Sequence, residues 1–587
     1  MTLGATWLGG GRCRFEVWAP RAERVALRLG DRALALEATA GGLHTATVEG
    51  VQAGDRYAFS LDGGPERPDP ASRWQPDGVH GRSAVVDPGA FRWTDRGFRT
   101  PALRDLVIYE LHVGTFTEEG TFDSATRHFA SLRELGITAL EPLPVAQFPG
   151  TRNWGYDGVL AWAAQDSYGG PEGLRRFVDA AHREGLAVLL DVVYNHVGPE
   201  GNYLGEFGPY FTDRYRTPWG DALNVDGPDS DEVRRYFRES ALMWLRECQV
   251  DGFRLDAVHA IVDRSARPFL AELTDAIHAE AARLGRSAIV IAESDRNDVA
   301  VITPTRERGL GFDATWSDDF HHSIHALLTG ERGGYYLDFG GVAPLADTLR
   351  RGWAYAGQRS AFRRRAHGNE PAGARAEQFV VSVQNHDQVG NRACGERLPA
   401  LVDLERVKVA AAALLLSPFT PMLFMGEEHG ETRPFLYFTS HADEDLIEAV
   451  RRGRREEFKE FAWQGEVPDP QSEATFAASM LDRSGGSDAL RALYAELLRL
   501  RGAIPALRPD RPDPAAVTSG EQAVALVRDG HAVVLAFGGG ALTLPPGRWE
   551  PLLDTADPRF GGPGALWSGH GGEVGFTGPR ALLLEHR

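Results

Sequence analysis

Apolar runs and amphipathic stretches alternate through the middle of the chain. From Leu106 onward, short apolar runs are followed by segments whose apolar residues recur with helical spacing. Near-continuous apolar runs are typical of parallel strands that are covered on both faces. The runs expected to be strands are 106–113, 137–145, 186–196, 250–258, 287–294, 311–316, 378–387 and 420–428, and the clearest expected helices are 124–135, 171–185, 231–248 and 489–502. Eight strands with intervening helices predict an α/β fold, a (β/α)8 TIM barrel.

The two ends of the chain have a different pattern. Short alternating segments separated by turn residues predict an N-terminal immunoglobulin-like β-sandwich over residues 1–100. Similar segments after Pro505 predict a small C-terminal β-domain over 505–587. The sandwich is either a structural cap on the barrel or a carbohydrate-binding module with Trp18 and Trp74 as stacking residues. The barrel domain is expected over 101–504, with a loop subdomain at 197–230 and a polar insertion at 431–476.

Composition narrows the class of protein. The net charge of -19 argues against nucleic acid or an anionic membrane as partner. Three widely separated cysteines suggest neither a disulfide framework nor a zinc cluster, and they fit a reducing cytoplasm. No basic stretch followed by an apolar core is visible at the N-terminus, and the longest purely apolar run, 409–416, is too short to span a bilayer. We therefore expect a soluble, cytoplasmic protein.

The stretch 251–259, DGFRLDAVH, places charge at the end of an expected strand. Side chains alternate between the two faces of a strand, so Arg254 and Asp256 point the same way. An arginine beside a carboxylate favours the ionised form and fixes its orientation, which a carboxylate nucleophile needs. A purely structural Arg/Asp pair is the alternative for this stretch taken alone.

Polar residues recur at the other expected strand ends, which in such barrels build the active site. They are His112, Asp191, Asn195, His196, His259, Glu293, Asp318, Asp319, His386, Asp387, Glu427 and Glu428. Gathering several acids costs free energy unless their charge is paired or used. A metal site is one alternative, but the spacing matches neither a zinc motif nor a calcium loop.

Carboxylates in different environments are what glycoside hydrolysis requires. One must be ionised to attack the sugar, and another must stay protonated to donate to the leaving oxygen. Asp256 beside Arg254 fits the first role. Glu293 follows the apolar run IVIA and has acidic neighbours, so its pKa should be raised, which suits a general acid. His196 and His386 are candidates for hydrogen bonds to sugar hydroxyls.

These residues resemble the α-amylase superfamily, glycoside hydrolase family thirteen. DVVYNH (191–196), DGFRLDAVH (251–259), AES (292–294) and QNHD (384–387) match its four motif regions in order. The resemblance implies a retaining mechanism on α-glucosidic bonds. Asp256 would be the nucleophile, Glu293 the acid/base and Asp387 the transition-state stabiliser. Arg254, His196 and His386 would line the subsite of the reacting glucose, with Tyr156 as a stacking platform.

Longer segments resemble one branch of that superfamily, the maltooligosyltrehalose trehalohydrolases. They include 109–125, 142–159, 198–211, 217–224, 311–331 and 384–397. The resemblance implies maltooligosyltrehalose as substrate, trehalose as product, a functional link to maltooligosyltrehalose synthase, and no metal or other cofactor. The family's binding segments would bring in Leu255, Ala257, Val258 and His259; Asp318, Asp319, Phe320, His321 and His322; and Gln388, Val389, Gly390 and Asn391. The segment 318–322 is the candidate for recognising the bend of trehalose, with Phe320 and the 198–219 loop as aromatic support.

Two alternatives remain open at this point. A 1,4-α-glucan branching enzyme shares the expected barrel, carboxylates and N-terminal sandwich, and it transfers the glucosyl group to a sugar hydroxyl instead of water. A non-catalytic glucan-binding protein is the alternative of another class, but Asp256, Glu293 and Asp387 are all present.

Overall fold

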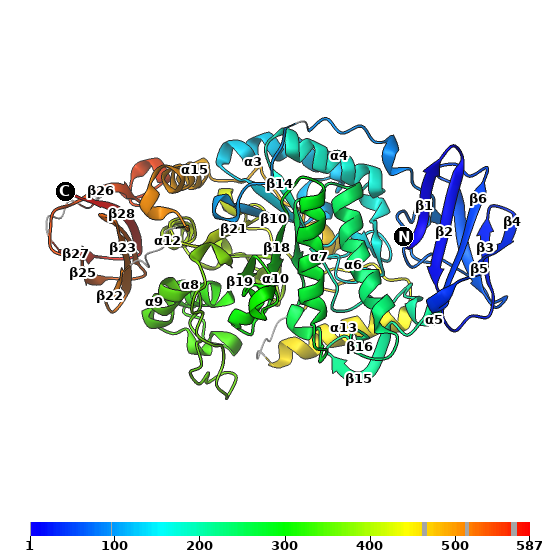
Figure 1. Cartoon of the computed structure of the whole chain (residues 1–587). Coiled ribbons are helices and arrows are strands. Elements are labelled where there is room, and N and C mark those ends of the chain that lie inside the picture. The colour runs from blue at the N-terminus through cyan, green and yellow to red at the C-terminus, as the bar shows by residue number, and fades with distance from the viewer. Residues whose placement is uncertain (1, 96, 461–466, 511–515, 565–566, 568–571) are drawn as a thin grey trace.

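The computed structural model describes all residues except Met1, Arg96, 461–466, 511–515, 565–566 and 568–571. The predicted insertion 431–476 and C-terminal domain 505–587 therefore each include residues that lie outside the described ones. An N-terminal pair of sheets, a central barrel and a C-terminal group of sheets follow one another along the long axis (Figure 1).

The central strands form a closed parallel barrel, which confirms the predicted fold class. Each strand pairs with the next and β21 closes on β10. The expected runs were longer than the strands, because their ends are loops that carry the polar residues. The strands are β10 Ile108–Leu111, β11 Ala139–Pro142, β14 Ala187–Val192, β17 Gly252–Leu255, β18 Ile289–Ala292, β19 Ala314–Trp316, β20 Phe379–Val381 and β21 Thr420–Phe424.

The barrel interior changes character along its axis. Ile108, Ala139 and Leu189 belong to an apolar cluster inside the barrel. Alternation along a strand directs every second residue to the same face. Two residues further toward the carboxyl ends, that face carries Glu110, Glu141 and Asp191, which are all buried. The apolar layer thus supports a layer of acidic and basic side chains at the end where the strands open.

Helices cover the outside of the barrel much as predicted. The expected helix 124–135 is an exception: it is divided into α2 Phe122–Ala125, a 3-10 turn at 126–128 and α3 Phe129–Leu135. At the break the Thr126 hydroxyl donates to the Asp123 carbonyl (2.7 Å), a side-chain bond that competes with regular helix. The other helices are α1 Val113–Phe116, α4 Gly170–Arg183, α5 Leu204–Phe207, α6 Ser230–Glu247, α7 Phe269–Arg283, α8 Asp318–Thr329, α9 Val342–Arg351, α10 His386–Gly390, α11 Leu398–Leu401, α12 Leu404–Leu415, α13 Glu444–Glu460, α14 Glu473–Ala478 and α15 Asp488–Ala503.

The N-terminal region consists of two sheets that lie against the barrel. Trp18 is only 2% exposed, and its indole N–H donates to the Gly41 carbonyl (3.0 Å). Trp74 is half-buried and donates to Asp166 of the barrel (2.8 Å). The interpretation of Trp18 as a stacking residue for carbohydrate is therefore wrong. The contacts of the two tryptophans favour the structural cap. The sheets are β1 Gly4–Gly9, β2 Arg12–Trp18, β6 Leu43–Glu49 and β5 Glu37–Ala38, and β4 Arg32–Ala35, β3 Val25–Leu29, β7 Arg56–Leu61 and β8 Glu66–Arg67, with β9 Ser83–Ala84 beside β7.

The loop subdomain and the C-terminal strands complete the fold. The predicted loop 197–230 contains a hairpin, β15 Phe211–Thr217 and β16 Gly220–Leu223; a short β-bulged ladder gave no clear alternation in the sequence. β12 Ala146–Gln147 pairs with β13 Leu160–Ala164. At the C-terminus the sheets are β22 Ala516–Ser519, β23 Ala523–Arg528, β24 His531–Ala536, β28 Arg580–His586 and β26 Trp549–Asp554, and β25 Gly540–Thr543 with β27 Glu573–Phe576. None of the described helices combines the length and apolar character needed to cross a membrane.

Candidate active site

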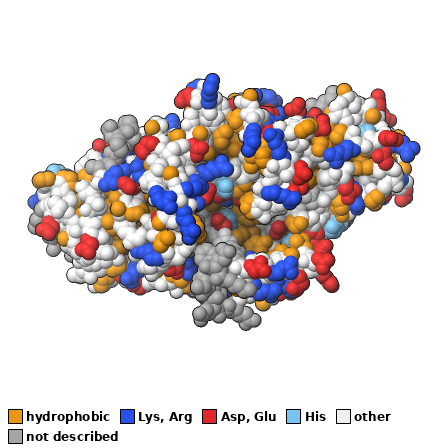
Figure 2. Space-filling view, turned by 90° about the horizontal axis from the view of Figure 1, so that it is seen from below, with side chains coloured by type: hydrophobic (Ala, Val, Ile, Leu, Met, Phe, Trp, Pro, Cys, Tyr) orange, Lys and Arg blue, Asp and Glu red, His pale blue; other side chains and the backbone are white. Residues whose placement is uncertain are grey.

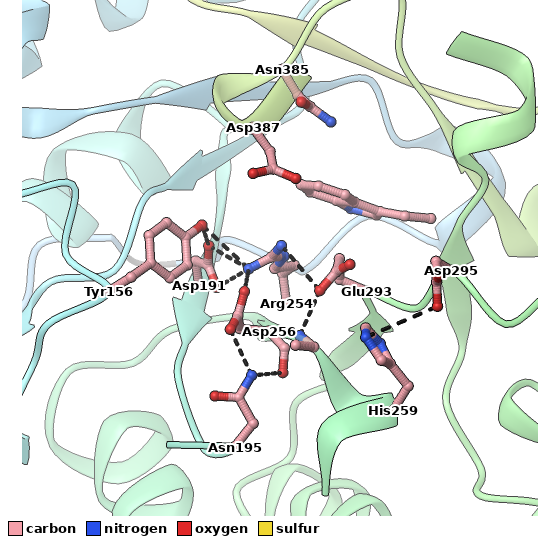
Figure 3. Close-up of polar contacts among 12 residues, drawn as sticks. Tyr156, Asp191, Asn195, Arg254, Asp256, His259, Glu293, Asp295, Asn385 and Asp387 are labelled. Atoms are coloured by element: carbon pink, nitrogen blue, oxygen red, sulfur yellow. Dashed lines mark hydrogen bonds and ion pairs between the residues drawn. The ribbon is translucent and has the colours of Figure 1, made fainter. Parts of the chain in front are cut away.

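Arg254 on β17 is the centre of this layer of acidic and basic side chains. Its guanidinium is 2% exposed and donates through Nη1 to Asp191 Oδ1 (2.8 Å) and Asp256 Oδ1 (2.9 Å). Nη2 lies 3.7 Å from Glu293 Oε2 (Figure 3). Parallel pairing of β14, β17 and β18 sets these residues side by side at the barrel mouth. One arginine thus links three carboxyl groups, and the strand alternation had predicted its pairing with Asp256.

Asp256 and Glu293 have different surroundings. The second oxygen of Asp256 accepts from Asn195 Nδ2 (2.7 Å), so both oxygens are held as acceptors. Glu293 Oε2 accepts the main-chain N–H of Ala257 (2.5 Å). Ala257 has φ +36°, a left-handed conformation that is costly for a residue with a Cβ. This strained turn directs the N–H of Ala257 toward Glu293, and no sequence pattern predicted it.

The pKa of Glu293 is raised well above its usual value. Burial is the largest cause, the Arg254 guanidinium opposes it, and the nearby charges of Asp256, Asp318 and Asp387 add to it. This agrees with the direction predicted from the apolar run before Glu293. Burial and the neighbouring carboxylates also raise the pKa of Asp318 to about 7. Arg254 lies closer to Asp256 than to Glu293, so the two carboxyl groups are suited to opposite protonation states.

Asp387 approaches from the opposite side of the site. It follows the N-terminus of α10, and its Oδ1 accepts from Asn391 Nδ2 (2.6 Å). Unlike Asp256 it is exposed, and it lines the cavity above Arg254 (Figure 3). We call Asp191, Arg254, Asp256, Glu293 and Asp387 the catalytic cluster.

A cavity of about 660 Å³ opens beside the catalytic cluster. Figure 2 shows a hollow near the centre of this face, where acidic and histidine side chains lie beside basic ones. The predicted residues that line the cavity are His259, Glu293, Asp318, Asp319, His322, Asp387, Gln388 and Asn391. Of the 318–322 segment, which forms the first turn and a half of α8, Asp318, Asp319 and His322 thus line the cavity. The Asp319 carboxylate also accepts the N–H groups of Ala354 (2.7 Å) and Tyr355 (3.2 Å), and so holds a loop.

Other predicted binding residues do not face the cavity. Phe320 is fully buried and packs against Phe419 at 6.3 Å between ring centroids, so its assignment as aromatic support for substrate is wrong. A helix turns by about 100° per residue, so its neighbours reach the site while Phe320 points into the core. His321 bonds to the Val383 carbonyl (2.9 Å) and the Tyr336 hydroxyl (3.1 Å). Four more of the predicted binding residues are also buried: Leu255, Val258, Val389 and Gly390.

The predicted aromatic and histidine residues of the glucose subsite are already hydrogen-bonded within the protein. The Tyr156 hydroxyl bonds to Asp191 (2.6 Å) and His386 (2.8 Å). His196 bonds to the Tyr156 carbonyl (2.9 Å) and stacks on Trp219, with ring centroids 4.4 Å apart. Trp219 is 48% exposed on the hairpin, at the end of the 198–219 loop from which aromatic support was expected.

The residues on one side of the cavity were not predicted from the sequence as binding residues. We call its residues the loop wall: Glu331, Tyr335, Phe362, Arg363 and Arg392. Arg363 pairs with Asp295 (3.0 Å), and Arg392 pairs with Glu331 (2.9 Å). Asp338 holds the chain beside Phe362 by accepting the N–H of Ala361 (3.0 Å). The only signal was a gathering of aromatic and arginine residues over 331–365 without periodicity.

Within the described part of the chain, no three His, Cys, Asp or Glu side chains are grouped as a metal site. The acids of the catalytic cluster are instead paired with Arg254 or hydrogen-bonded to amides. Their chemistry is that of acid–base and nucleophilic catalysis.

Comparisons with known proteins agree with this geometry. The profile "Alpha amylase, catalytic domain" matches residues 88–217. The chain is 50% identical to the malto-oligosyltrehalose trehalohydrolase of Saccharolobus solfataricus over 83% of this chain and 84% of that protein. For the enzyme of that name from Arthrobacter ramosus, identity is 48% over 85% and 88%. A solved structure from Salmonella typhimurium, described as a candidate alpha amylase, covers all of both chains with TM-score 0.90 and 39% identity. Identity to a 1,4-alpha-glucan branching enzyme of Corynebacterium jeikeium is 27%, over 73% of this chain and 62% of that protein.

Proposed function

The chain belongs to the family of malto-oligosyltrehalose trehalohydrolases, and from this premise we propose how it acts and on what. It hydrolyses the α-1,4 bond between a maltooligosaccharide and a terminal trehalose, with retention of configuration, and releases free trehalose. The observation that carries the reaction class is Arg254 between Asp256 and Glu293 at the base of a cavity. It sets one carboxylate ready to attack and leaves the other protonated.

In the first step, Asp256 attacks the anomeric carbon of the glucose next to trehalose. Arg254 and Asn195 hold both of its oxygens, which favours the ionised form and fixes the direction of attack. Glu293 donates its proton to the bridging oxygen, so trehalose leaves with an intact hydroxyl. A covalent glycosyl–Asp256 intermediate results.

In the second step, water replaces trehalose. The ionised Glu293 takes a proton from water, which attacks the anomeric carbon and releases Asp256. The proton taken from water stays on Glu293 and restores the starting state. Asp387 lies on the exposed side of the site, where its negative charge stabilises the positively charged sugar of each transition state.

Selection of the trehalose end falls to the cavity beyond the cluster. Trehalose turns back through its α,α-1,1 linkage, so its outer glucose needs a surface at an angle to a straight glucan. Tyr335 and Phe362 offer aromatic faces there, and Asp318 and His322 offer polar groups. A straight chain would leave these groups without partners, which penalises the wrong isomer. His259, Gln388 and Asn391 complete the polar lining.

The branching-enzyme alternative differs only in what accepts the glycosyl group. The lower identity to a branching enzyme and the smaller share of that protein covered favour hydrolysis. A non-catalytic role would leave the catalytic cluster without a use for its strained turn at Ala257.

The cellular setting is part of the proposal. An acidic surface does not favour nucleic acid or anionic membranes, and the three cysteines are free. We place the enzyme in the cytoplasm, where maltooligosyltrehalose synthase supplies its substrate.

The experiment is a product analysis on two substrates of matched length. One is a maltooligosaccharide capped with trehalose, and the other is the plain maltooligosaccharide. Rapid release of trehalose from the first, with little cleavage of the second, supports the proposal. Equal cleavage of both, or longer and branched transfer products, would contradict it.

A further inference from the structure

Both ring nitrogens and the main-chain N–H of His386 have hydrogen-bond partners. His386 is 2% exposed and begins α10, next to Asp387. Its Nδ1 lies 2.6 Å from one oxygen of Glu110, and its main-chain N–H donates to the other oxygen (2.8 Å). On the far side of the ring, Nε2 lies 2.8 Å from the Tyr156 hydroxyl. Each ring nitrogen of His386 therefore faces an oxygen atom, and the other contacts of that oxygen indicate where its proton lies.

The first of these oxygens belongs to Tyr156. Its hydroxyl has one proton and lies 2.6 Å from Asp191 Oδ2. Asp191 takes two contacts from Arg254 (2.8 and 2.9 Å), as a carboxylate does. Burial raises the pKa of Asp191 to about 6, which leaves it ionised at neutral pH. The Tyr156 proton therefore points to Asp191, and the Tyr156 oxygen must accept from His386 Nε2.

The other edge of the ring gives the same answer. Glu110 accepts the main-chain N–H of His386 with one oxygen, and its other oxygen lies 2.6 Å from Nδ1, a hydrogen bond that contains one proton. With that proton on Nδ1, Glu110 is a carboxylate and both ring nitrogens of His386 are protonated. An imidazole that donates from both nitrogens is the cation.

We propose that Glu110 is a positioning residue that keeps His386 as an imidazolium, whose two N–H groups fix the direction of a hydrogen-bond chain reaching Asp256. The chain runs from Glu110 through His386, Tyr156 and Asp191 to Arg254, and Arg254 holds the nucleophile. The proposal rests on the proposed function for the role of Asp256. Its statement about the protons of His386 is independent of the substrate.

The charges around His386 are consistent with a cation. Burial by itself lowers the pKa of His386, but the charge and hydrogen bond of Glu110, helped by Asp387, outweigh burial and the opposing charge of Arg254, so the pKa is raised. The remaining faces meet the uncharged rings of Trp154 and Trp316. Burial lowers the pKa of the nearby His112 to about 4, so that ring adds no charge at neutral pH.

Glu141 provides a matched control. It pairs in register with Glu110 on the neighbouring strand and is equally buried. Both of its carboxyl oxygens lack a hydrogen-bond partner. Burial, with the charges of Glu110 and Asp191, raises its pKa well above the usual value, so it is neutral. Exchanging Glu141 for glutamine therefore changes shape and charge very little, whereas the same exchange at Glu110 removes the charge that faces His386.

The direct test is neutron diffraction from crystals of the wild-type protein exchanged into heavy water at about neutral acidity. Deuterium on both Nδ1 and Nε2 of His386 is the expected result. A single deuterium on the ring would overturn the proposal, whatever substrate the enzyme uses.

The functional test compares Glu110→Gln with Glu141→Gln. In Glu110→Gln, the pKa of His386 should fall, because burial and the charge of Arg254 lower it and Glu110 no longer opposes them. We expect kcat to fall about tenfold at pH values above this lowered pKa and to recover toward wild type below it, with KM little changed. Glu141→Gln should keep the wild-type profile. A loss of activity that is equal at all pH values would show a merely structural role for Glu110, and a shifted profile in both variants would also contradict the proposal.

Discussion

The catalytic cluster and the loop wall face the same cavity but are built in different ways. In the cluster, Asp191 and Arg254 lie on barrel strands, Asp256 and Glu293 directly follow them, and Asp387 lies in α10, shortly after β20. The loop wall comes from the connection between β19 and β20 and from the loop after α10. Within the cluster, carboxylates share one buried arginine. In the wall, aromatic rings and half-buried ion pairs lie side by side.

This difference separates chemistry from selection. Strands fix their ends within the barrel ladder, so the distance between reacting groups is set by the most rigid part of the fold. Loops change shape without disturbing that ladder, and they suit the recognition of a particular leaving group. We expect changes in the cluster to alter kcat on every substrate, and changes in the wall to alter the preference between substrates.

The largest effect is expected for Asp256→Ala. The variant removes the nucleophile and should lower kcat by roughly 10⁴-fold or more on any substrate. Its fold should be retained, because the side chain lies at the mouth and not in the apolar layer. Single-turnover kinetics and circular dichroism measure the two properties. Substantial turnover in a folded variant would remove Asp256 from the mechanism and break the distinction between cluster and wall.

Glu293→Gln should lower kcat by about 10²–10⁴-fold, because the amide cannot protonate the leaving oxygen. The wild-type enzyme should also lose activity on the basic side. The pKa of Glu293 is raised by burial, so the acid stays protonated to higher pH than an ordinary glutamate and loses its proton as pH rises through the raised value. A pH profile of kcat/KM measures this limb. A profile with an acid limb alone would contradict the role of Glu293.

How far the sequence predicts the molecule follows from the same distinction. The barrel strands and the positions of Arg254, Asp256 and Glu293 were predictable, because strand alternation carries information about which side chains share a face. The strained turn at Ala257 was not, because it depends on the contact with Glu293. Nor was the inward direction of Phe320, since the whole 318–322 segment was taken as a unit. The sequence of the loop wall has no periodicity that predicts its structure. Its residues are positioned by tertiary contacts, such as that of Tyr335 with His322, whose ring centroids are 4.5 Å apart.

A smaller effect, confined to selection, is expected at the loop wall. Tyr335→Ala and Phe362→Ala each remove an aromatic face from the cavity. We expect kcat/KM on the trehalose-capped substrate to fall about tenfold, with much less change on the plain maltooligosaccharide. Competition between the two substrates measures the ratio. Leu337→Ala is the matched control, because Leu337 is exposed in the same loop and does not line the cavity. Equal losses on both substrates would assign Tyr335 and Phe362 to general sugar binding.

The smallest effect on selection is expected at Phe320, in a matched pair with His322 on α8. His322 lines the cavity. Phe320, two residues before it, is buried against Phe419. Phe320→Leu should lower the free energy of unfolding by about 1–2 kcal/mol through lost packing and leave the substrate ratio unchanged. His322→Leu should change the ratio, because a polar group is withdrawn from the trehalose end. Urea unfolding and substrate competition measured on both variants separate the two effects. If Phe320→Leu shifted the ratio as much as His322→Leu, selection would depend on the position of α8 as a whole and not on the side chains that face the cavity.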